Sequence, residues 1–284
     1  MKWKILLATG LVLLGCFPAY AGVRDSEGFK RVRIAEVYNP PAAQFLILRF
    51  DEPLSNIGEA PPVWQTLQAE TGPEIEKLND ILTISYYDMI ITGDADYADL
   101  LESRDLLRER APVWYERLIL AGPENRRAET EGFSVPEIMS RISVQNDLFF
   151  SLLTDDFVRK TEIELWKVAD EIKTGENRGY VETSRDAVSA LMQAGDENGF
   201  VLVGEGSFAQ YVESERYSPP LVKVADTDYF RVTYVCLMSN AGFRRNRADD
   251  AAKYMEWFQG VDAGEIIAAF SIGGLNPFVH VNTQ

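Results

Sequence analysis

The sequence predicts an α/β protein with mostly parallel sheets. Short apolar runs typical of strands alternate along the chain with segments whose apolar residues recur at helical spacing. The composition, 46% hydrophobic and 25% charged, is that of a globular protein rather than a disordered one. The 284 residues suit one large domain or two medium ones, and no internal repeat is evident.

The first half is predicted to begin with two short strands and a helix that Gly72-Pro73 interrupts. The next strand is apolar and ends in the polar turn Gly93–Asp96. A helix follows it, with Leu100, Leu101 and Leu107 expected on its inner face. The predicted strands are 32–37, 45–50, 88–92 and 116–121, and the predicted helices are 63–82 and 97–110.

The second half repeats this alternation. Ser134 is placed to start a helix, with Pro136 in its first turn. Cys236 lies in an apolar strand, so we expect a buried and inert thiol. The predicted strands are 148–153, 200–203 and 229–238, and the predicted helices are 135–142, 156–172, 187–194, 207–215, 249–259 and 263–270.

Residues Met1–Ala21 have the pattern of a secretory signal peptide. Lys2 and Lys4 precede a short apolar run, and Ala19-Tyr20-Ala21 is a small-x-small cleavage site. Leu13–Cys16 also resembles a lipobox that would make Cys16 a lipidated N-terminus. We favour cleavage after Ala21, which predicts a periplasmic protein.

The charged and reactive residues exclude several classes of function. Lys and Arg number 28 and Asp and Glu 44, a net charge of −16; removal of residues 1–21 leaves 26 against 44, a net −18. No basic cluster for nucleic acid is present. One histidine and two cysteines cannot build a multi-histidine or four-cysteine metal site. His280 is expected to be a strand-like surface or half-buried residue rather than a catalytic base. We therefore predict no enzymatic activity, cofactor or metal.

In parallel sheets, ligands bind at the carboxyl ends of the strands. The loops at those ends are 38–39, 92–96, 151–156, 183–186 and 204–207. Asp155 and Asp156 fit either helix-start acids or cation ligands. Thr183–Asp186 fits a capping box with Thr183 as N-cap and Asp186 reaching back, although Arg185 is also a candidate anion ligand.

Several segments resemble one known family in their order and spacing. They are Tyr87–Asp96, Pro112–Pro123, Glu162–Lys167, Gly179–Thr183, Gly199–Val203, Gly206–Phe208 and Ala251–Phe278, which includes Gly273-Gly274. Together they are similar to the periplasmic tungstate-binding proteins of ABC importers.

The resemblance implies a two-lobed type II solute-binding fold, with two mixed sheets flanked by helices and a central cleft. Lobe one would comprise residues 22–121 and 229–284, and lobe two residues 122–228. The lobes would close about a hinge around a solute, which is then passed to an ABC permease in the membrane. The predicted ligand-binding residues are Tyr38, Asn39, Ser151, Asp155, Asp156, Thr183, Ser184, Arg185, Glu205 and Ser207.

The ligand loops depart from the family pattern. Relatives carry a Thr/Ser-rich first loop, where this chain has Tyr38–Gln44, and an arginine- and glycine-rich loop, where it has Ser151–Val158. Asp186 and Glu205 stand where relatives present glycine or arginine to an oxyanion. Helix N-termini attract anions, so carboxylates there oppose oxyanion binding.

We therefore predict an exported solute-binding protein, the substrate receptor of a tungstate-type ABC importer with altered ligand specificity. Its solute is an oxyanion such as tungstate by the resemblance, or a neutral or cationic ligand by the altered loops. Two alternatives stay open. One is a ligand sensor or adaptor for a membrane signalling protein, and the other is a degenerate binding protein.

Overall fold

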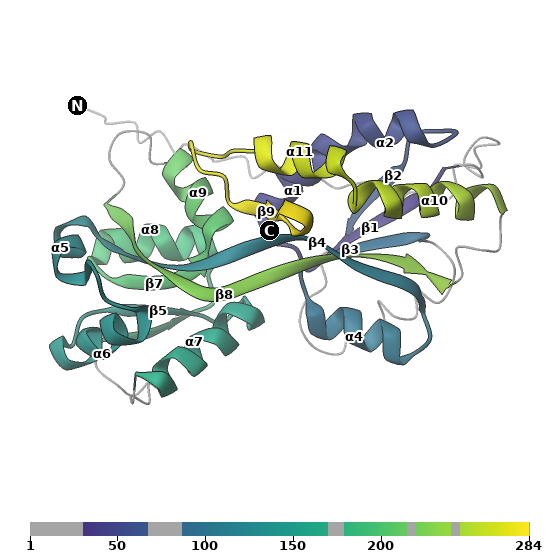
Figure 1. The fold of residues 1–284 in the computed structure, drawn as a ribbon. Coiled ribbons are helices and arrows are strands. Elements are labelled where there is room, and N and C mark those ends of the chain that lie inside the picture. The colour runs from purple at the N-terminus through teal and green to yellow at the C-terminus, as the bar shows by residue number, and fades with distance from the viewer. Residues whose placement is uncertain (1–30, 68–86, 170–178, 215–219, 240–244, 284) are drawn as a thin grey trace, which may run out of the picture.

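The computed structural model describes residues 31–67, 87–169, 179–214, 220–239 and 245–283 (Figure 1). The predicted signal peptide and the break at Gly72-Pro73 lie outside these residues. The helices are α1 (Pro41–Ile47), α2 (Asp51–Ile57), α4 (Ala95–Ser103), α5 (Arg127–Thr130), α6 (Val135–Gln145), α7 (Asp156–Val168), α8 (Ala187–Glu197), α9 (Glu205–Ser214), α10 (Arg245–Phe258) and α11 (Val261–Ala269), with 3-10 turns η1 (Leu48–Phe50), η2 (Glu124–Arg126) and η4 (Val281–Thr283).

The strands form one connected sheet in the order β2-β1-β3-β8-β4-β7-β5-β6, with β9 paired to β4. β1 is parallel to β2 and β3, and β5 is parallel to β6 and β7, whereas β4 and β8 pair antiparallel. The strands are β1 (Arg33–Val37), β2 (Val63–Leu67), β3 (Met89–Thr92), β4 (Leu107–Pro123), β5 (Phe149–Leu152), β6 (Tyr180–Thr183), β7 (Phe200–Gly204), β8 (Leu221–Met238) and β9 (Phe278–His280).

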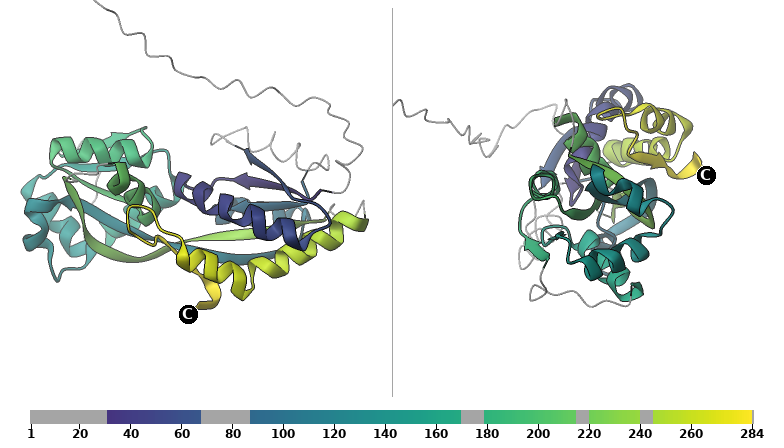
Figure 2. Two further views of the ribbon diagram at one scale, coloured as in Figure 1. Left: turned by 90° about the horizontal axis from the view of Figure 1, so that it is seen from above. Right: turned by 90° about the vertical axis from the view of Figure 1, so that its left-hand side faces the viewer.

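The expectation of two separate mixed sheets needs one correction, because β4 and β8 join them. These strands have 17 and 18 residues and pair from Leu107↔Met238 to Pro123↔Leu221. Each passes from one half of the molecule into the other, as the long teal and green strands of Figure 1 show. Viewed from above, the two halves lie side by side and are joined by these strands (Figure 2).

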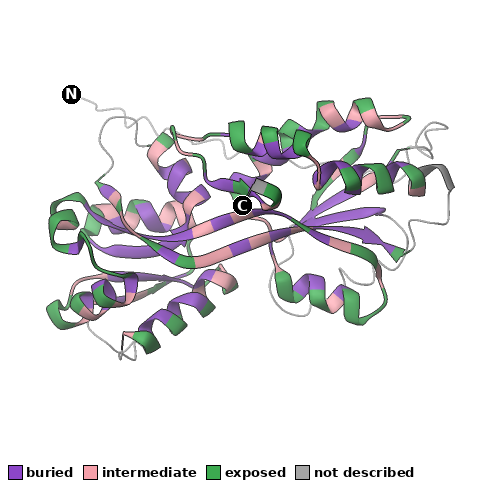
Figure 3. Ribbon diagram, in the orientation of Figure 1, coloured by how far each residue is buried: buried purple, intermediate pink, exposed green. Residues whose placement is uncertain are grey.

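Each half has its own buried core (Figure 3). In one half, α1, α2, α10 and α11 pack around Trp114 and Phe50 on one face of the sheet, while α4 covers the other face with Tyr97 and Leu101. In the other half, α6, α7, α8 and α9 enclose Phe149. The residue boundaries proposed for the two lobes stay a prediction.

The predicted strand at 45–50 is wrong, because these residues belong to α1 and η1. Pro41 opens the helix at a position where proline is favoured. The buried residues recur at helical spacing, whereas the continuous apolar run from Phe45 to Leu48 suggested a buried strand. The residues that α1 and η1 bury are Ala42, Ala43, Leu46, Ile47 and Phe50.

The predicted helix at 63–82 is also wrong where the structure describes it. Val63–Leu67 is strand β2, paired in parallel with β1 from Arg33↔Val63 to Val37↔Leu67. Pairing with β1 satisfies the backbone hydrogen bonds of this segment. The local spacing of apolar residues cannot reveal a partner strand that lies so far away along the chain.

The helix predicted to run through Arg110 ends at Ser103. Asp105 has a φ of 57°, a left-handed conformation that stops the helix, and Leu107 begins β4. Other predicted elements differ mainly at their ends. Ser134 caps α6 in a capping box with Glu137.

The single cysteine and the single histidine of the described residues are both buried. Cys236 is buried in β8 as expected, and burial raises the pKa of its thiol to about 12. His280 is buried, rather than at the surface or half-buried as expected, since β9 pairs with β4 and the His280 ring lies 3.1 Å from the carbonyl oxygen of Phe258.

Candidate functional site

The predicted ligand loops follow the carboxyl ends of β1, β3, β5, β6 and β7. Two contacts bring loops of the two halves together. Asp155, at the start of α7, pairs with Arg231 of β8, and Lys160 of α7 pairs with Asp96 of α4. We call the region around Arg231, Glu116 and Asp155 the loop site.

The centre of the loop site is a buried group of three charges. Arg231 is 5% exposed; its Nη2 lies 2.5 Å from Asp155 Oδ2, and its Nη1 lies 3.5 Å from Glu116 Oε2. Burial alone would lower the pKa of Arg231, but the charges of Asp155 and Glu116 raise it. The guanidinium therefore stays charged and is already balanced by carboxylates of the chain.

Glu116 is 1% exposed and lies directly opposite Arg231 in the β4–β8 register. Burial raises the pKa of its carboxyl, while Arg231 and the N–H of Gly206, which donates to Oε1 at 2.9 Å, act in the opposite direction. A Cβ on Gly204 would lie 2.4 Å from Glu116 Oε1. Glycine at this position leaves room for the buried carboxylate.

The helix N-termini at the loop site carry acidic side chains. Asp94 accepts a hydrogen bond from the N–H of Tyr97 at the start of α4, and Asp155 accepts one from the N–H of Val158 at the start of α7. Glu205 is the first residue of α9. These carboxylates take up the backbone donors and the positive end of the helix dipole that an anionic ligand would use.

The capping box predicted at Thr183–Asp186 has a different geometry. Asp186 is itself the N-cap of α8 and accepts from the N–H and hydroxyl of Ser189 at 3.0 and 2.6 Å. Thr183 instead accepts from the N–H of Arg185 at 3.2 Å. Burial acts to raise the pKa of Asp186, but the hydrogen bonds from Ser189 act in the opposite direction and the pKa is lowered. The N-terminus of α8 thus also carries a carboxylate.

Tyr38 and Asn39 lie together after β1. Tyr38 has a φ of 53°, and its ring packs edge-on against Tyr97 at 5.3 Å between centroids. Asn39 Nδ2 donates to the carbonyl oxygen of Ile91 at 2.9 Å. A Cβ on Gly93 would lie 3.2 Å from Asn39 Oδ1 and 3.3 Å from Arg231 Cδ, so these residues converge there.

Ser151 lies in a second polar network, inside the half that contains α7. It is buried in β5, and its hydroxyl donates to Glu162 at 2.6 Å. Arg159 and Tyr180 also bind Glu162, and burial raises the pKa of that carboxyl. The Ser151 hydroxyl is thus engaged within the protein.

The remaining predicted residues differ in exposure. Thr183 and Ser207 are buried, whereas Asp156, Ser184 and Arg185 are exposed. Glu205 pairs with Lys223 at 3.1 Å. The structure therefore brings Asn39 and Asp155 close to Arg231, and places Ser184 and Arg185 at the surface.

Sequence reasoning missed Arg231 and Glu116, although both lie in predicted strands. The available signal was a single charge in the apolar run Phe230-Arg231-Val232, and the charged pair Glu116-Arg117 in the strand 116–121. A charge in a buried strand requires a partner. Identifying the two as partners required the register of β4 and β8.

The described residues contain neither a cluster of metal ligands nor a membrane-spanning helix. No group of three or more His, Cys, Asp or Glu side chains there is arranged to hold a metal ion. Among the same residues, no helix has both the length and the apolar character needed to cross a membrane.

Comparison with known proteins supports the resemblance found in the sequence. A tungstate-binding protein from Desulfovibrio alaskensis has a TM-score of 0.74 at 17% identity, over 88% of this chain and 98% of its own. The chain has the type II periplasmic-binding-protein fold. A tungstate ABC transporter protein from Geobacter sulfurreducens has a TM-score of 0.65 at 16% identity, covering 85% and 99%, and iron-bound HitA from Pseudomonas aeruginosa a TM-score of 0.60 at 11%, covering 84% and 85%.

The sequence comparison confirms the resemblance to tungstate-binding proteins. The tungstate-binding protein TupA of Campylobacter jejuni is 21% identical over 166 residues. The match covers 58% of this chain and 61% of that relative's length. No family model matches the chain. These relatives are solute-binding proteins rather than enzymes.

Proposed function

We propose that the protein is an exported solute receptor that delivers its solute to an ABC permease, and that its solute is neutral or cationic and organic. The receptor role is supported by the type II fold and by the solute-binding relatives. Export is supported by the signal-peptide pattern of Met1–Ala21. The change of solute is supported by the loop site.

The observation that carries the proposal is the pairing of Arg231 with Asp155 and Glu116. An oxyanion bound here would have to displace Asp155 from both Arg231 and the N–H of Val158. It would also enter beside the buried Glu116 carboxylate. Stripping a partly buried carboxylate of its partners costs more than a typical hydrogen bond contributes, so anion binding is disfavoured.

Calorimetry with the purified mature protein tests this proposal. The dissociation constants for tungstate and molybdate should lie well above the micromolar range. A sub-micromolar dissociation constant for either anion would overturn the proposal. In Asp155→Asn the freed Arg231 should accept an anion, so molybdate affinity should rise at least tenfold. The matched control is Asp156→Asn, which neutralises the adjacent exposed carboxylate and should leave molybdate affinity unchanged.

The solute itself can be identified by native mass spectrometry of protein freshly purified from its host. A retained neutral or cationic organic molecule is the expected result. An oxyanion retained in stoichiometric amount would contradict the proposal. A retained solute should also raise the unfolding temperature when added back to the stripped protein.

A further inference from the structure

The carboxyl group of Glu116 lies where the two halves of the molecule meet. Its strand, β4, passes from one half into the other (Figure 1). A Cβ added to Gly206 would lie 2.7 Å from Glu116 Oε1 and 2.7 Å from the Cβ of Ala42. Gly206 is in the first turn of α9 and Ala42 is in α1, and these helices pack on the two different cores. The carboxyl group is therefore close to elements of both halves.

This carboxyl group is closely enclosed. Glu116 is 1% exposed, and a Cβ added to Gly204 would lie 2.4 Å from its Oε1. Phe278 stands opposite Glu116 in the β4–β9 register and is itself buried. Its ring lies 3.4 Å from the position that a Cβ on Gly206 would take. The carboxyl group thus fills a space that two glycines leave open.

The groups that face the carboxyl group are those that bind anions. The N–H of Gly206, in the first turn of the ten-residue helix α9, donates to Oε1 at 2.9 Å. Nη1 of Arg231 lies 3.5 Å from Oε2, which is buried and accepts no hydrogen bond within the described part of the chain. An N–H at a helix start and a guanidinium are both donors that recognise the oxygens of an anion. Here the anion comes from the chain itself.

Charge balance for Arg231 does not by itself explain this carboxyl group. One guanidinium carries one positive charge, and Asp155 already pairs with it at 2.5 Å. Asp155 is also the more exposed of the two acids, since 26% of its side chain is accessible against 1% for Glu116. A second carboxylate at full burial is costly. Its position is explained if it replaces a bound anion.

We propose that Glu116 is a built-in anionic ligand, whose carboxyl group occupies an anion position between the two halves and excludes anions of the solution from it. The inference deepens the proposed function, and rests on it for the role of the loop site in solute binding. Glu116 thereby determines specificity together with Asp155. The vacated position would take a small carboxylate, because the group that Glu116→Ala removes, CH₂–COO⁻, has nearly the size and the charge of acetate.

Calorimetry with acetate at neutral pH on the purified mature Glu116→Ala variant tests the proposal. The variant should bind one acetate with a roughly millimolar dissociation constant, since so small a ligand makes few contacts. Acetamide has nearly the same shape without the charge and should bind at least tenfold more weakly. Wild type and Glu116→Gln, whose side chains still fill the position, should not show this binding.

The matched control is Glu109→Ala, which removes an exposed carboxylate from the same strand and should gain no acetate affinity. If Glu116→Ala is unfolded in buffer, acetate but not acetamide should restore its native tryptophan fluorescence. Equal effects of acetate and acetamide would refute the proposal, as would a variant that neither binds acetate nor refolds in it. Tungstate affinity of the wild type tests the proposed function separately, so the two failures are distinguishable.

Discussion

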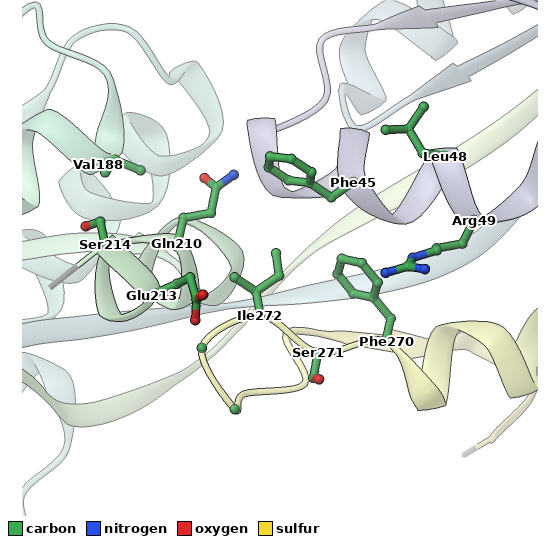
Figure 4. Close-up of a pocket in the computed structure, with 12 residues that line it drawn as sticks. Phe45, Leu48, Arg49, Val188, Gln210, Glu213, Ser214, Phe270, Ser271 and Ile272 are labelled. Carbon is green, nitrogen blue, oxygen red and sulfur yellow. The ribbon is translucent and has the colours of Figure 1, made fainter. Parts of the chain in front are cut away.

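The loop site differs from the groove lined by α1, η1, α9 and residues 270–274 in how its charged side chains are paired (Figure 4). In the loop site, Arg231 is buried and balanced by Asp155 and Glu116. In the groove, Arg49 is exposed and Gln210 Oε1 accepts no hydrogen bond among the described residues. Arg231 is thus paired with carboxylates of the chain, whereas Arg49 pairs with no carboxylate of the described residues.

Under the proposed function, this difference explains how a chain with the type II fold binds a different solute. A fold determines where strand ends and helix N-termini meet, but not which side chains stand there. In this chain, Asp94, Asp155 and Asp186 cap three of those helices and accept from their backbone N–H groups. The proposed change of solute therefore rests on these few side chains at the helix N-termini.

The largest expected difference between the two regions is between their arginines. Arg231→Ala leaves Glu116 and Asp155 without their cation and should lower the unfolding free energy by about 3–5 kcal/mol. Arg49→Ala removes an exposed side chain and should change it by less than about 0.5 kcal/mol. Urea unfolding followed by tryptophan fluorescence measures both. Similar losses in the two variants would show that Arg231 is not balanced as described.

The next effect separates capping from charge balance. Asp155→Ala and Asp186→Ala each remove an N-cap, which costs about 1 kcal/mol. Asp155→Ala also takes a carboxylate from Arg231, so it should cost about 1.5–3 kcal/mol more. The comparison of their urea midpoints is direct because both caps accept from the helix backbone. Equal midpoints would assign Asp155 a capping role alone.

The smallest effect is expected from Glu116→Gln, and it depends on pH. The raised pKa of Glu116 means that the folded protein binds this proton more tightly than the unfolded chain does. The unfolding free energy of wild type should therefore fall relative to the variant as pH rises from about 4.5 through the raised pKa, and the difference should then stay constant. Each unit of raised pKa corresponds to about 1.4 kcal/mol.

Unfolding of wild type and Glu116→Gln in urea between pH 4 and 8 checks this prediction. The opposite trend, with wild type gaining stability as pH rises, would mean that Arg231 outweighs burial and lowers the Glu116 pKa. Arg108→Gln, which changes an exposed charge on the same strand, should show no comparable trend.

Most elements of the fold were predictable because their signals are local. Ser134 with Glu137 forms a capping box, and the apolar spacing of α6 to α9 is helical. Two elements were assigned the wrong type, at 45–50 and 63–67, and the helix predicted to Arg110 extended into β4. At 45–50 and 63–67 the apolar pattern suits either structure. There the distant partner decides: β2 exists because it pairs with β1.

The sequence by itself determined the α/β class, the acidic character, the resemblance to tungstate-binding proteins and the acids at the helix starts. These follow from composition, period and order along the chain. Only the tertiary structure paired Arg231 with Glu116 and Asp155, and only it joined residues from α1, α9 and 270–274 into a groove. The reason is physical: a charge is balanced, and a cavity is enclosed, by residues that are near in space and far apart in sequence.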